Sequence, residues 1–356
     1  MLVDGPASIT LTSGKAEVFG SQLWSPQKTL IREGKRLPFK ILENATFDVT
    51  PGKEAALCEV DGDTIPRTWQ TAVAISQEIR ETPATVMVVG GVDSGKSSLC
   101  TYLANRFVNK HCKVAVLDED LGQSDIGPPC AVAYAMVNKP VTDLFNLKPE
   151  KVRFVGVTSP SMAPNKTVDA TAALVSDVRA RADLVIVNTD GWVLGEDAVA
   201  FKKRLAEEVK PDVVFFLKRR GEPLNFSCWF AEAFAGFKVE LIDSPLVVGE
   251  RNREKRKSLR ELGFAKYLEN ARMRVYSTDN VLVEGLEKAS LFELGNVENL
   301  LVGLQDAKRC YLGIGIIRCV DLGRKVLGVF TAVEETPAIV CLGAVRLDKS
   351  LREIQS

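Results

Sequence analysis

The first part of the chain alternates short apolar and polar stretches. The segments 7–20, 37–52 and 55–62 show this alternation and are separated by Gly, Pro, Asn and Asp. A period of two fits strands with one buried face, and the separating residues are those of tight turns. The pattern predicts a small antiparallel β-domain, which we place at residues 1–75.

A different pattern occupies residues 84–245. Apolar runs alternate with segments of helical character at 97–109, 168–181 and 197–208. The apolar runs are 85–91, 113–118, 153–158, 183–191, 212–218 and 238–243. Strands that are apolar throughout are typical of a parallel sheet covered by helices on both faces. We therefore expect a central α/β domain at residues 76–272.

The last part of the chain returns to alternation with Gly turns. A charged segment at 249–270 comes first, and the β-like pattern resumes at about residue 275. We expect a small β-rich domain at residues 273–356. A length of 356 residues is consistent with two or three domains.

Composition limits the classes of function. The chain is 46% hydrophobic and 26% charged, and no apolar run approaches the length of a membrane span. It begins MLVDGPASIT, without the basic and apolar regions of a secretory signal, so we expect a cytoplasmic protein with no membrane partner. Lys plus Arg equals Asp plus Glu at 46 each, so a nucleic-acid contact would need a local basic patch.

The cysteines and the single histidine argue against two kinds of site. The eight cysteines contain no CxxC pair, so we expect buried free thiols and neither zinc nor disulfides. His111 precedes a predicted strand, where a solvated loop histidine is expected. Metal ligation or acid–base catalysis by histidine is therefore not predicted.

A phosphate-binding motif stands between the first central strand and its helix. Gly90-x-x-x-x-Gly95-Lys96-Ser97 is a complete Walker A pattern. Its backbone amides and the helix N-terminus attract anions, Lys96 reaches the β- and γ-phosphates, and Ser97 binds Mg²⁺. The fold class expected is thus a P-loop NTPase domain flanked by two β-domains. The predicted nucleotide-binding residues are Gly91, Val92, Asp93, Ser94, Gly95, Lys96, Ser97 and Ser98.

Acidic residues follow two of the predicted strands. Asp118 and Asp120 end the second strand, and Asp190 follows the fourth. Carboxylates two residues apart can share a crevice, one toward magnesium and one toward the acceptor. The alternative is that these residues are helix caps or solvated turn residues.

Three further segments suggest an acceptor site. Trp192 lies in a loop beyond the fourth strand, at the edge where open α/β sheets bind ligands, and could stack a base or anchor the loop. The loop 155–168 offers Thr158, Ser159 and Asn165, which could bind phosphate or cap a helix.

The third segment, 249–261, is rich in arginine and could close over the transferring phosphoryl group or form a solvated face. A helix there would place Arg253, Arg256 and Arg260 on roughly one face.

Taken in order, these motifs resemble the polynucleotide 5′-hydroxyl kinases of the Clp/Grc type. They are GxxDSGKSS, DEDLGQSDIGPP, TSPSMAPN, NTDGWVLG and R-x-x-E-x-R-x-x-x-R before FAKYL. The opening 4–20 and closing 341–354 segments are also similar to that family's terminal domains, so the resemblance spans the chain. The single-chain form is most like the archaeal members.

The resemblance implies a role for each matching position. ATP phosphates and Mg²⁺ are held by Lys96 and Ser97, and Asp120 is the general base for the 5′-hydroxyl. The remaining assignments are Asp118 and Gln123 around metal, phosphates and acceptor; Thr158, Ser159 and Asn165 as the acceptor clasp; Trp192 as the stacking residue; and Arg251 and Arg256 as the lid arginines. Asp190 departs from some relatives, so its place in the magnesium shell stays open.

The function expected is transfer of the ATP γ-phosphate to the 5′-hydroxyl of RNA or DNA. One alternative is an ATP-binding assembly module of an RNA-processing complex with little turnover. Another is a regulatory NTPase, which is disfavoured because the chain has no Asn-Lys-x-Asp motif and Trp192 would be unexplained. The sequence does not choose between RNA and DNA, and it names no protein partner.

Overall fold

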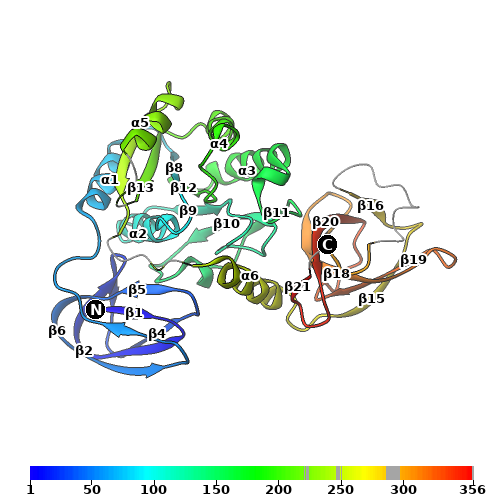
Figure 1. Ribbon diagram of the computed structural model, residues 1–356, viewed down its shortest axis with the longest axis horizontal. Helices are drawn as coiled ribbons and strands as arrows, with labels where there is room; N and C mark the ends of the chain where they lie inside the picture. The colour runs from blue at the N-terminus through cyan, green and yellow to red at the C-terminus, as the bar shows by residue number, and fades with distance from the viewer. Residues whose placement is uncertain (220, 222–223, 246–248, 250, 286–296, 355–356) are drawn as a thin grey trace.

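The structure is a computed structural model. It describes all residues except 220, 222–223, 246–248, 250, 286–296 and 355–356. For residues 224–228 it describes the backbone but not the side chains. A central sheet with helices on both faces stands between two β-structures, and helix α6 (Arg253–Tyr267) lies beneath it between them (Figure 1). The α/β class with flanking β-structures is confirmed, whereas the domain boundaries stay a prediction.

The N-terminal β-structure is antiparallel, as the alternation predicts. Its strands are β1 (Leu2–Asp4), β2 (Ala7–Val18), β3 (Ser21–Leu23), β4 (Gln27–Ile31), β5 (Arg36–Pro38), β6 (Lys40–Pro51) and β7 (Leu57–Cys58). Strand β2 pairs with β3, β4 and β6, and its alternate residues Ile9 and Leu11 are fully buried. One face of this sheet therefore forms a core, and the other faces solvent.

The central sheet has seven strands in the order β11-β10-β9-β12-β8-β13-β14. Their bounds are β8 (Ala84–Gly90), β9 (Val114–Asp118), β10 (Ala131–Val137), β11 (Lys151–Phe154), β12 (Leu184–Asn188), β13 (Val213–Lys218) and β14 (Val239–Asp243). The five neighbouring strands β9, β12, β8, β13 and β14 are parallel to one another. Strand β10 is antiparallel to both β9 and β11. The expected parallel sheet is therefore a mixed one, because strand β10, which was not among the predicted apolar runs, runs opposite to both neighbours. The connection from β10 to β11 contains no crossover helix, only the 3₁₀ turn Leu144–Asn146.

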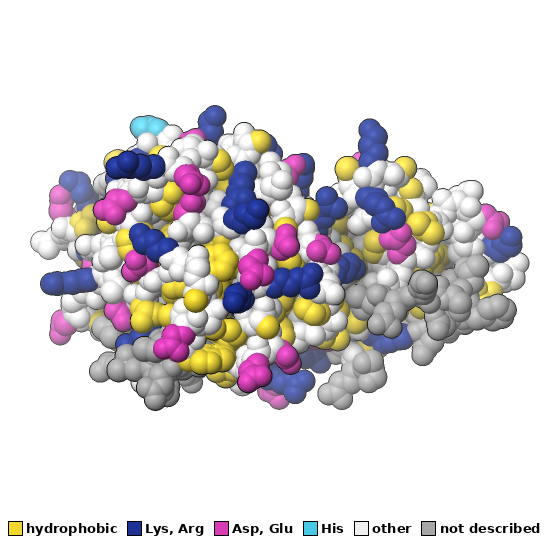
Figure 2. Space-filling model, turned by 90° about the horizontal axis from the view of Figure 1, so that it is seen from above, with side chains coloured by type: hydrophobic (Ala, Val, Ile, Leu, Met, Phe, Trp, Pro, Cys, Tyr) yellow, Lys and Arg dark blue, Asp and Glu magenta, His cyan; other side chains and the backbone are white. Residues whose placement is uncertain are grey.

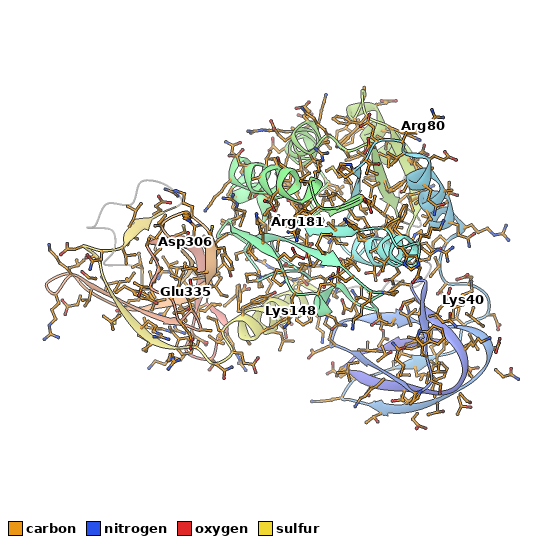
Figure 3. The ribbon with its side chains drawn as sticks, turned by 180° about the vertical axis from the view of Figure 1, so that it is seen from behind. Lys40, Arg80, Lys148, Arg181, Asp306 and Glu335 are labelled. Atoms are coloured by element: carbon orange, nitrogen blue, oxygen red, sulfur yellow. The ribbon has the colours of Figure 1, made fainter. Side chains whose placement is uncertain are left out.

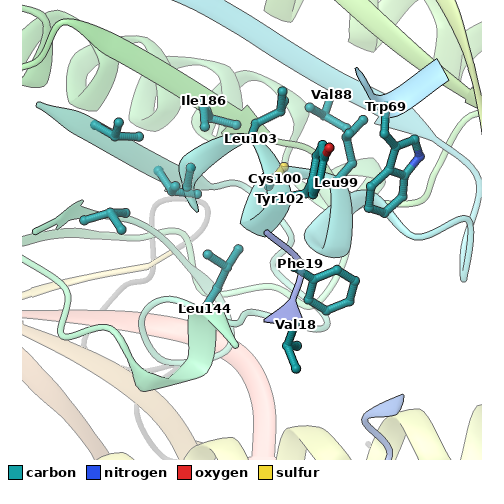
Figure 4. Packing of buried hydrophobic residues seen from close by; sticks show 14 of the residues in the cluster. Val18, Phe19, Trp69, Val88, Leu99, Cys100, Tyr102, Leu103, Leu144 and Ile186 are labelled. Atoms are coloured by element: carbon teal, nitrogen blue, oxygen red, sulfur yellow. The ribbon is translucent and has the colours of Figure 1, made fainter. Parts of the chain in front are cut away.

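Helices cover both faces of this sheet. They are α1 (Arg67–Glu78), α2 (Lys96–Val108), α3 (Pro164–Arg179), α4 (Glu196–Val209) and α5 (Leu224–Ala233), with the short turn Pro160–Met162 before α3. Val86 and Val88 pack with α1, α2 and the N-terminal β-structure, whereas Met87 and Val89 pack with α3 to α5. Figure 4 shows the first of these cores around Phe19, Trp69 and Leu103. The central strands, which are apolar throughout, are thus buried on both faces of the sheet.

The C-terminal β-structure is mostly antiparallel. Its strands are β15 (Arg272–Ser277), β16 (Leu282–Glu284), β17 (Leu300–Gln305), β18 (Tyr311–Asp321), β19 (Val326–Thr331), β20 (Ile339–Leu347) and β21 (Glu353–Ile354). The order is β15-β19-β18-β17-β20-β16, with β21 on β20. It has its own core, which includes Val302, Leu304 and Val329.

The surface agrees with the neutral charge balance. Figure 2 shows basic and acidic side chains interspersed over one face. Lys40, Lys148, Arg181 and Glu335 are exposed on different parts of the molecule (Figure 3). In the described part of the chain, no helix combines the length and apolar character needed to cross a membrane.

The cysteine expectation is only partly confirmed. The seven cysteines whose side chains are described are all free, and the side chain of Cys228 lies outside the described residues. Cys100, Cys130 and Cys341 are buried, but Cys58, Cys310 and Cys319 are exposed. The exposed ones lie on the β-structures, where one side of a strand faces water. His111 is exposed in the turn before β9, as expected.

Candidate active site

The loop between β8 and α2 has the conformation that anion binding requires. Asp93 and Gly95 adopt left-handed backbone angles, with φ of 55° and 95°. A Cβ on Gly95 would lie 2.9 Å from Pro245 Cδ, and one on Gly90 would lie 2.8 Å from Ser94 Oγ. Gly95 therefore permits both the left-handed turn and the close approach of Pro245, and Gly90 leaves room for the Ser94 side chain.

Lys96 and Ser94 are the buried polar side chains of this loop. Lys96 Nζ donates to the carbonyls of Gly90 and Gly91 at 2.9 and 2.7 Å. Burial lowers the pKa of Lys96, although Asp120 and Asp190 oppose this effect. Within the described residues, the buried hydroxyl of Ser94 has no hydrogen-bond partner. A phosphate oxygen would supply the partner that this hydroxyl lacks.

A cleft of about 720 Å³ opens over the loop and reaches the N-terminal β-structure and α6. Most of the predicted site residues line it. They are Val92, Asp93, Ser94, Gly95, Lys96, Ser97, Ser98, Asp120, Gln123, Thr158, Ser159, Trp192, Arg251 and Arg256, and Asp190 joins them. Of the predicted residues, all of which are described, Gly91, Asp118 and Asn165 lie outside this lining.

Asp118 is buried beneath the cleft and organises the loop that follows β9. Its Oδ2 accepts from the amides of Asp125 and Ile126 at 2.6 and 3.0 Å. Its Oδ1 accepts from Asn188 Nδ2 at 2.9 Å, and the same amide group donates to Ser97 Oγ at 3.3 Å. Burial, followed by repulsion from Asp125 and Asp120, raises the pKa of Asp118 to about 7. Asp118 therefore reaches the predicted metal ligand Ser97 through Asn188.

Asp120 lines the cleft near Lys96. Its Oδ1 accepts from the amides of Gly122 and Gln123 at 3.0 and 2.8 Å, which fixes the carboxylate at the start of a turn. Burial and repulsion from Asp190 raise the pKa of Asp120, while Lys96 and the two amides lower it in part. Among the hydrogen bonds of the described residues, none involves Asp120 Oδ2.

Asp190 is held by a buried lysine that was not predicted. Lys202 of α4 is ion-paired with Asp190 and lies 3.2 Å from Glu119 Oε2, and both acids are buried. Burial opposes the charge of Lys202, but Asp190 and Glu119 more than offset this effect and raise its pKa. Lys202 does carry a sequence signal, because it interrupts the apolar stripe formed by Val199, Leu205 and Val209.

Trp192 combines the two alternatives considered for it. Its amide donates to Asp190 Oδ1 at 2.5 Å, and its ring stacks on Phe201 with centroids 5.7 Å apart. The side chain is only partly buried and also lines the cleft. Trp192 is thus an anchored ring with surface available to a ligand.

The loop that precedes α3 enters the cleft only in part. Thr158 and Ser159 line it, and Ser159 Oγ lies 2.8 Å from Ser161 Oγ. Asn165 is exposed in the first turn of α3 and accepts a hydrogen bond from Arg204. The structure therefore does not bring Asn165 together with the other predicted acceptor residues.

The arginine-rich segment forms α6 and is largely paired. Arg251 Nε lies 2.9 Å from Asp93 Oδ1, and Arg256 Nη1 lies 3.4 Å from Asp93 Oδ2. Arg260 makes a two-point contact with Glu353 at 2.6 and 2.8 Å. Arg253 is exposed outside the cleft lining, and residue 250 lies outside the described residues. A simple solvated face is therefore excluded for the described part of the segment.

The N-terminal β-structure supplies cations that were not predicted. Arg32 pairs with Asp125 and Asp143, and Lys35 Nζ lies 3.2 Å from Asp143 Oδ1. Arg32 and Lys35 also line the cleft. The sequence offers no signal for this, because Arg32 and Lys35 flank an ordinary polar turn and their partners lie about a hundred residues away.

Comparisons with known proteins agree with this architecture. The family model for the mRNA cleavage and polyadenylation factor CLP1 P-loop matches residues 90–270. A polyribonucleotide 5′-hydroxyl-kinase of Pyrococcus furiosus is 28% identical over 326 residues, covering 76% of this chain and 90% of the relative. One from Methanocaldococcus jannaschii is 26% identical, covering 76% and 89%.

A solved structure has the same fold along nearly the whole chain. The Clp1p–Pcf11p complex contains a chain that matches with a TM-score of 0.72 at 15% identity, over 97% of both chains. The family model covers half of the sequence and includes the phosphate-binding loop, the Trp192 loop and α6. The chain belongs to the CLP1 P-loop family.

Proposed function

We propose that this protein is a polynucleotide 5′-hydroxyl kinase that transfers the γ-phosphate of ATP to the 5′-hydroxyl of RNA. The observation that carries the proposal is one cleft lined by Lys96, Asp120 and Trp192. These side chains match the three requirements of the reaction: a phosphate site, a base and a surface for a nucleobase. The names of the archaeal relatives support a ribonucleotide acceptor.

ATP would be held by residues 91–98, with Lys96 against its β- and γ-phosphates. The Ser94 hydroxyl supports this fit, because it is a buried donor of the phosphate-binding loop that has no hydrogen-bond partner among the described residues. Mg²⁺ would bind Ser97, with Asp120 at the cleft edge and Asp118 acting through Asn188. Magnesium typically uses few protein ligands together with substrate phosphates, and the described residues contain no cluster of three or more metal-binding side chains. When bound, it neutralises charge on the transferring group.

Asp120 would act as the general base. Two amides fix its Oδ1, and the carboxylate faces the cleft, so Oδ2 is available to accept the proton of the 5′-hydroxyl. Its raised pKa makes it a stronger base than a solvated aspartate. As the 5′-oxygen bonds to the γ-phosphorus, the bond to the β–γ bridging oxygen breaks and ADP leaves.

Trp192 would hold the acceptor by stacking on its terminal base. Phe201 supports one side of the indole, so stacking would not require the ring to be ordered first. Thr158 and Ser159 would contact the end of the acceptor from the opposite loop. The guanidinium groups of Arg251 and Arg256 would offset charge on the phosphates.

The proposal is tested by phosphate transfer from γ-labelled ATP. The wild-type protein with Mg²⁺ should label a 5′-hydroxyl RNA oligonucleotide but not the same oligonucleotide with a 5′-phosphate. Lys96→Ala and Asp120→Ala should each reduce transfer by at least a hundredfold, because one removes phosphate stabilisation and the other the base. A matched DNA oligonucleotide tests the preference for RNA.

An assembly module that only holds ATP predicts a different outcome. Such a protein would retain bound ATP and label neither RNA nor DNA under any of these conditions. That result, obtained with folded wild-type protein, would reject the kinase proposal.

A further inference from the structure

Asp93 is an acid within a loop whose other groups attract anions. Its carboxylate accepts from Arg251 Nε at 2.9 Å, from the Arg251 amide at 3.0 Å and from Arg256 Nη1 at 3.4 Å. The side chain is only 6% exposed. One carboxylate of the phosphate-binding loop thus binds both arginines that the sequence assigns to phosphate contact.

A negative charge at this position opposes nucleotide binding. A carboxylate beside a bound triphosphate repels it, and both compete for the same guanidinium groups. Asp93 also has a left-handed backbone, which an aspartate adopts more readily than most residues but which glycine would adopt without strain. Phosphate binding alone therefore does not explain why an aspartate occupies position 93 of the phosphate-binding loop.

The contacts of Asp93 fix the beginning of α6 as well as two side chains. The Arg251 amide is bound by Asp93, and the Arg251 carbonyl accepts from Arg256 Nη1 at 2.6 Å. Asn252 then caps the helix by accepting from the Lys255 amide at 2.7 Å. A chain of bonds therefore runs from the phosphate-binding loop to the first turn of α6.

We propose that Asp93 is a positioning residue that aligns Arg251 and Arg256 with the phosphate-binding loop, so that they meet the transferring phosphoryl group in a fixed orientation. The inference rests on the proposed kinase function. Preorganised charges contribute to the transition state because no reorganisation is needed when charge develops. Asp93 favours turnover at some expense in ground-state nucleotide affinity.

Asp93→Asn separates these two effects. The amide keeps one acceptor oxygen but lacks the charge that holds two guanidinium groups. We expect kcat to fall at least tenfold, while affinity for ATP stays equal or increases. Damage to the loop alone would instead weaken ATP binding. The double variant Asp93→Asn/Arg256→Ala should be little slower than the slower single variant, because both changes remove the same aligned group.

Glu353→Gln is the matched control. It removes a carboxylate from an arginine on the same helix, at a contact with the C-terminal β-structure. We expect its kcat to stay within about twofold of wild type, because Glu353 lies outside the cleft lining and its carboxylate contacts neither Arg251 nor Arg256. Hydrogen exchange of a peptide covering 251–256 should be faster in Asp93→Asn but unchanged in Glu353→Gln, since the Arg251 amide is bound by Asp93.

The inference is overturned if Asp93→Asn turns over at the wild-type rate, if the losses in the double variant simply multiply, or if exchange of this peptide does not change. Failure of the kinase proposal would look different. Wild-type protein would then transfer no phosphate, and the exchange comparison would still decide whether Asp93 holds the start of α6.

Discussion

At the scale of single residues, Lys202 shows how burial gives a side chain its role. The lysine is fully buried between Asp190 and Glu119, and Asp190 in turn holds the Trp192 amide. Both Asp190 oxygens are thereby engaged by protein groups. This arrangement favours Asp190 as a support for the Trp192 loop and argues against a place in the magnesium shell.

Lys202→Met should destabilise the protein by about 3–5 kcal/mol, because it leaves two buried acids without their cation. The triple variant Lys202→Met/Asp190→Asn/Glu119→Gln should recover most of that loss, since no uncompensated charge is then buried. Urea unfolding followed by circular dichroism measures the free energy of unfolding of the single and the triple variant. Equal stability of the single variant and the wild type would contradict the pairing described here.

At the scale of elements, the loop between β8 and α2 is determined by local sequence. The strand and helix begin and end within about one residue of the ranges expected from the motif. Glycines at both ends permit the turn, and Lys96 Nζ donates to the carbonyls of Gly90 and Gly91 within it. No long-range contact is needed to predict it, which explains why the motif was sufficient.

Gly95→Ala should reduce ATP affinity at least tenfold and stability by about 1–2 kcal/mol, because the left-handed backbone disfavours a Cβ. The added methyl would also meet Pro245 Cδ at 2.9 Å. Gly62→Ala is the control, since its φ of 84° is similar and no heavy atom lies within 4 Å of the new Cβ. It should lose comparable stability but no ATP affinity, as measured by calorimetric titration and thermal unfolding.

At the scale of the whole molecule, charge pairs connect the two β-structures to the cleft. Arg32 joins the N-terminal β-structure to Asp125 and Asp143, and Arg260 joins α6 to Glu353 near the C-terminus. Lys255 of α6 also pairs with Glu33. The cleft is therefore a product of all three parts of the chain, and α6 is anchored at both sides.

Acid should weaken the contact at Arg32. Burial raises the pKa of Asp143, but Lys35 and Arg32 more than offset it, so the folded-state pKa lies below the ordinary value. The stabilisation is fully present above roughly pH 3.9 and is lost as the pH falls through the lower folded-state pKa. Asp143→Asn should therefore unfold more easily than wild type at pH 7, with a difference that shrinks toward pH ~2. The urea midpoints of both proteins measure this difference. A difference that stays constant from pH 7 to pH ~2 would contradict the assignment of the effect to Asp143.

The sequence by itself determined the features that depend on neighbouring residues. The alternation of strands and helices in the central domain, the P-loop with its strand and helix, and the acids at strand ends follow from local patterns and spacing, although strand β10 was not predicted. Its family resemblance also led to the predicted roles of Trp192, Arg251 and Arg256, because their motifs are short and occur in a specific order.

Only the tertiary structure decided which distant groups meet. Asp93 and Arg251 are 158 residues apart, and Arg32 and Asp143 are 111 apart, so no local pattern encodes their pairing. The reversed direction of β10 and the exclusion of Asn165 from the cleft were likewise settled by packing. The physical reason is common to all of them: an ion pair or a strand pairing depends on the distance between two parts of the folded chain, whereas a local motif depends only on its own backbone.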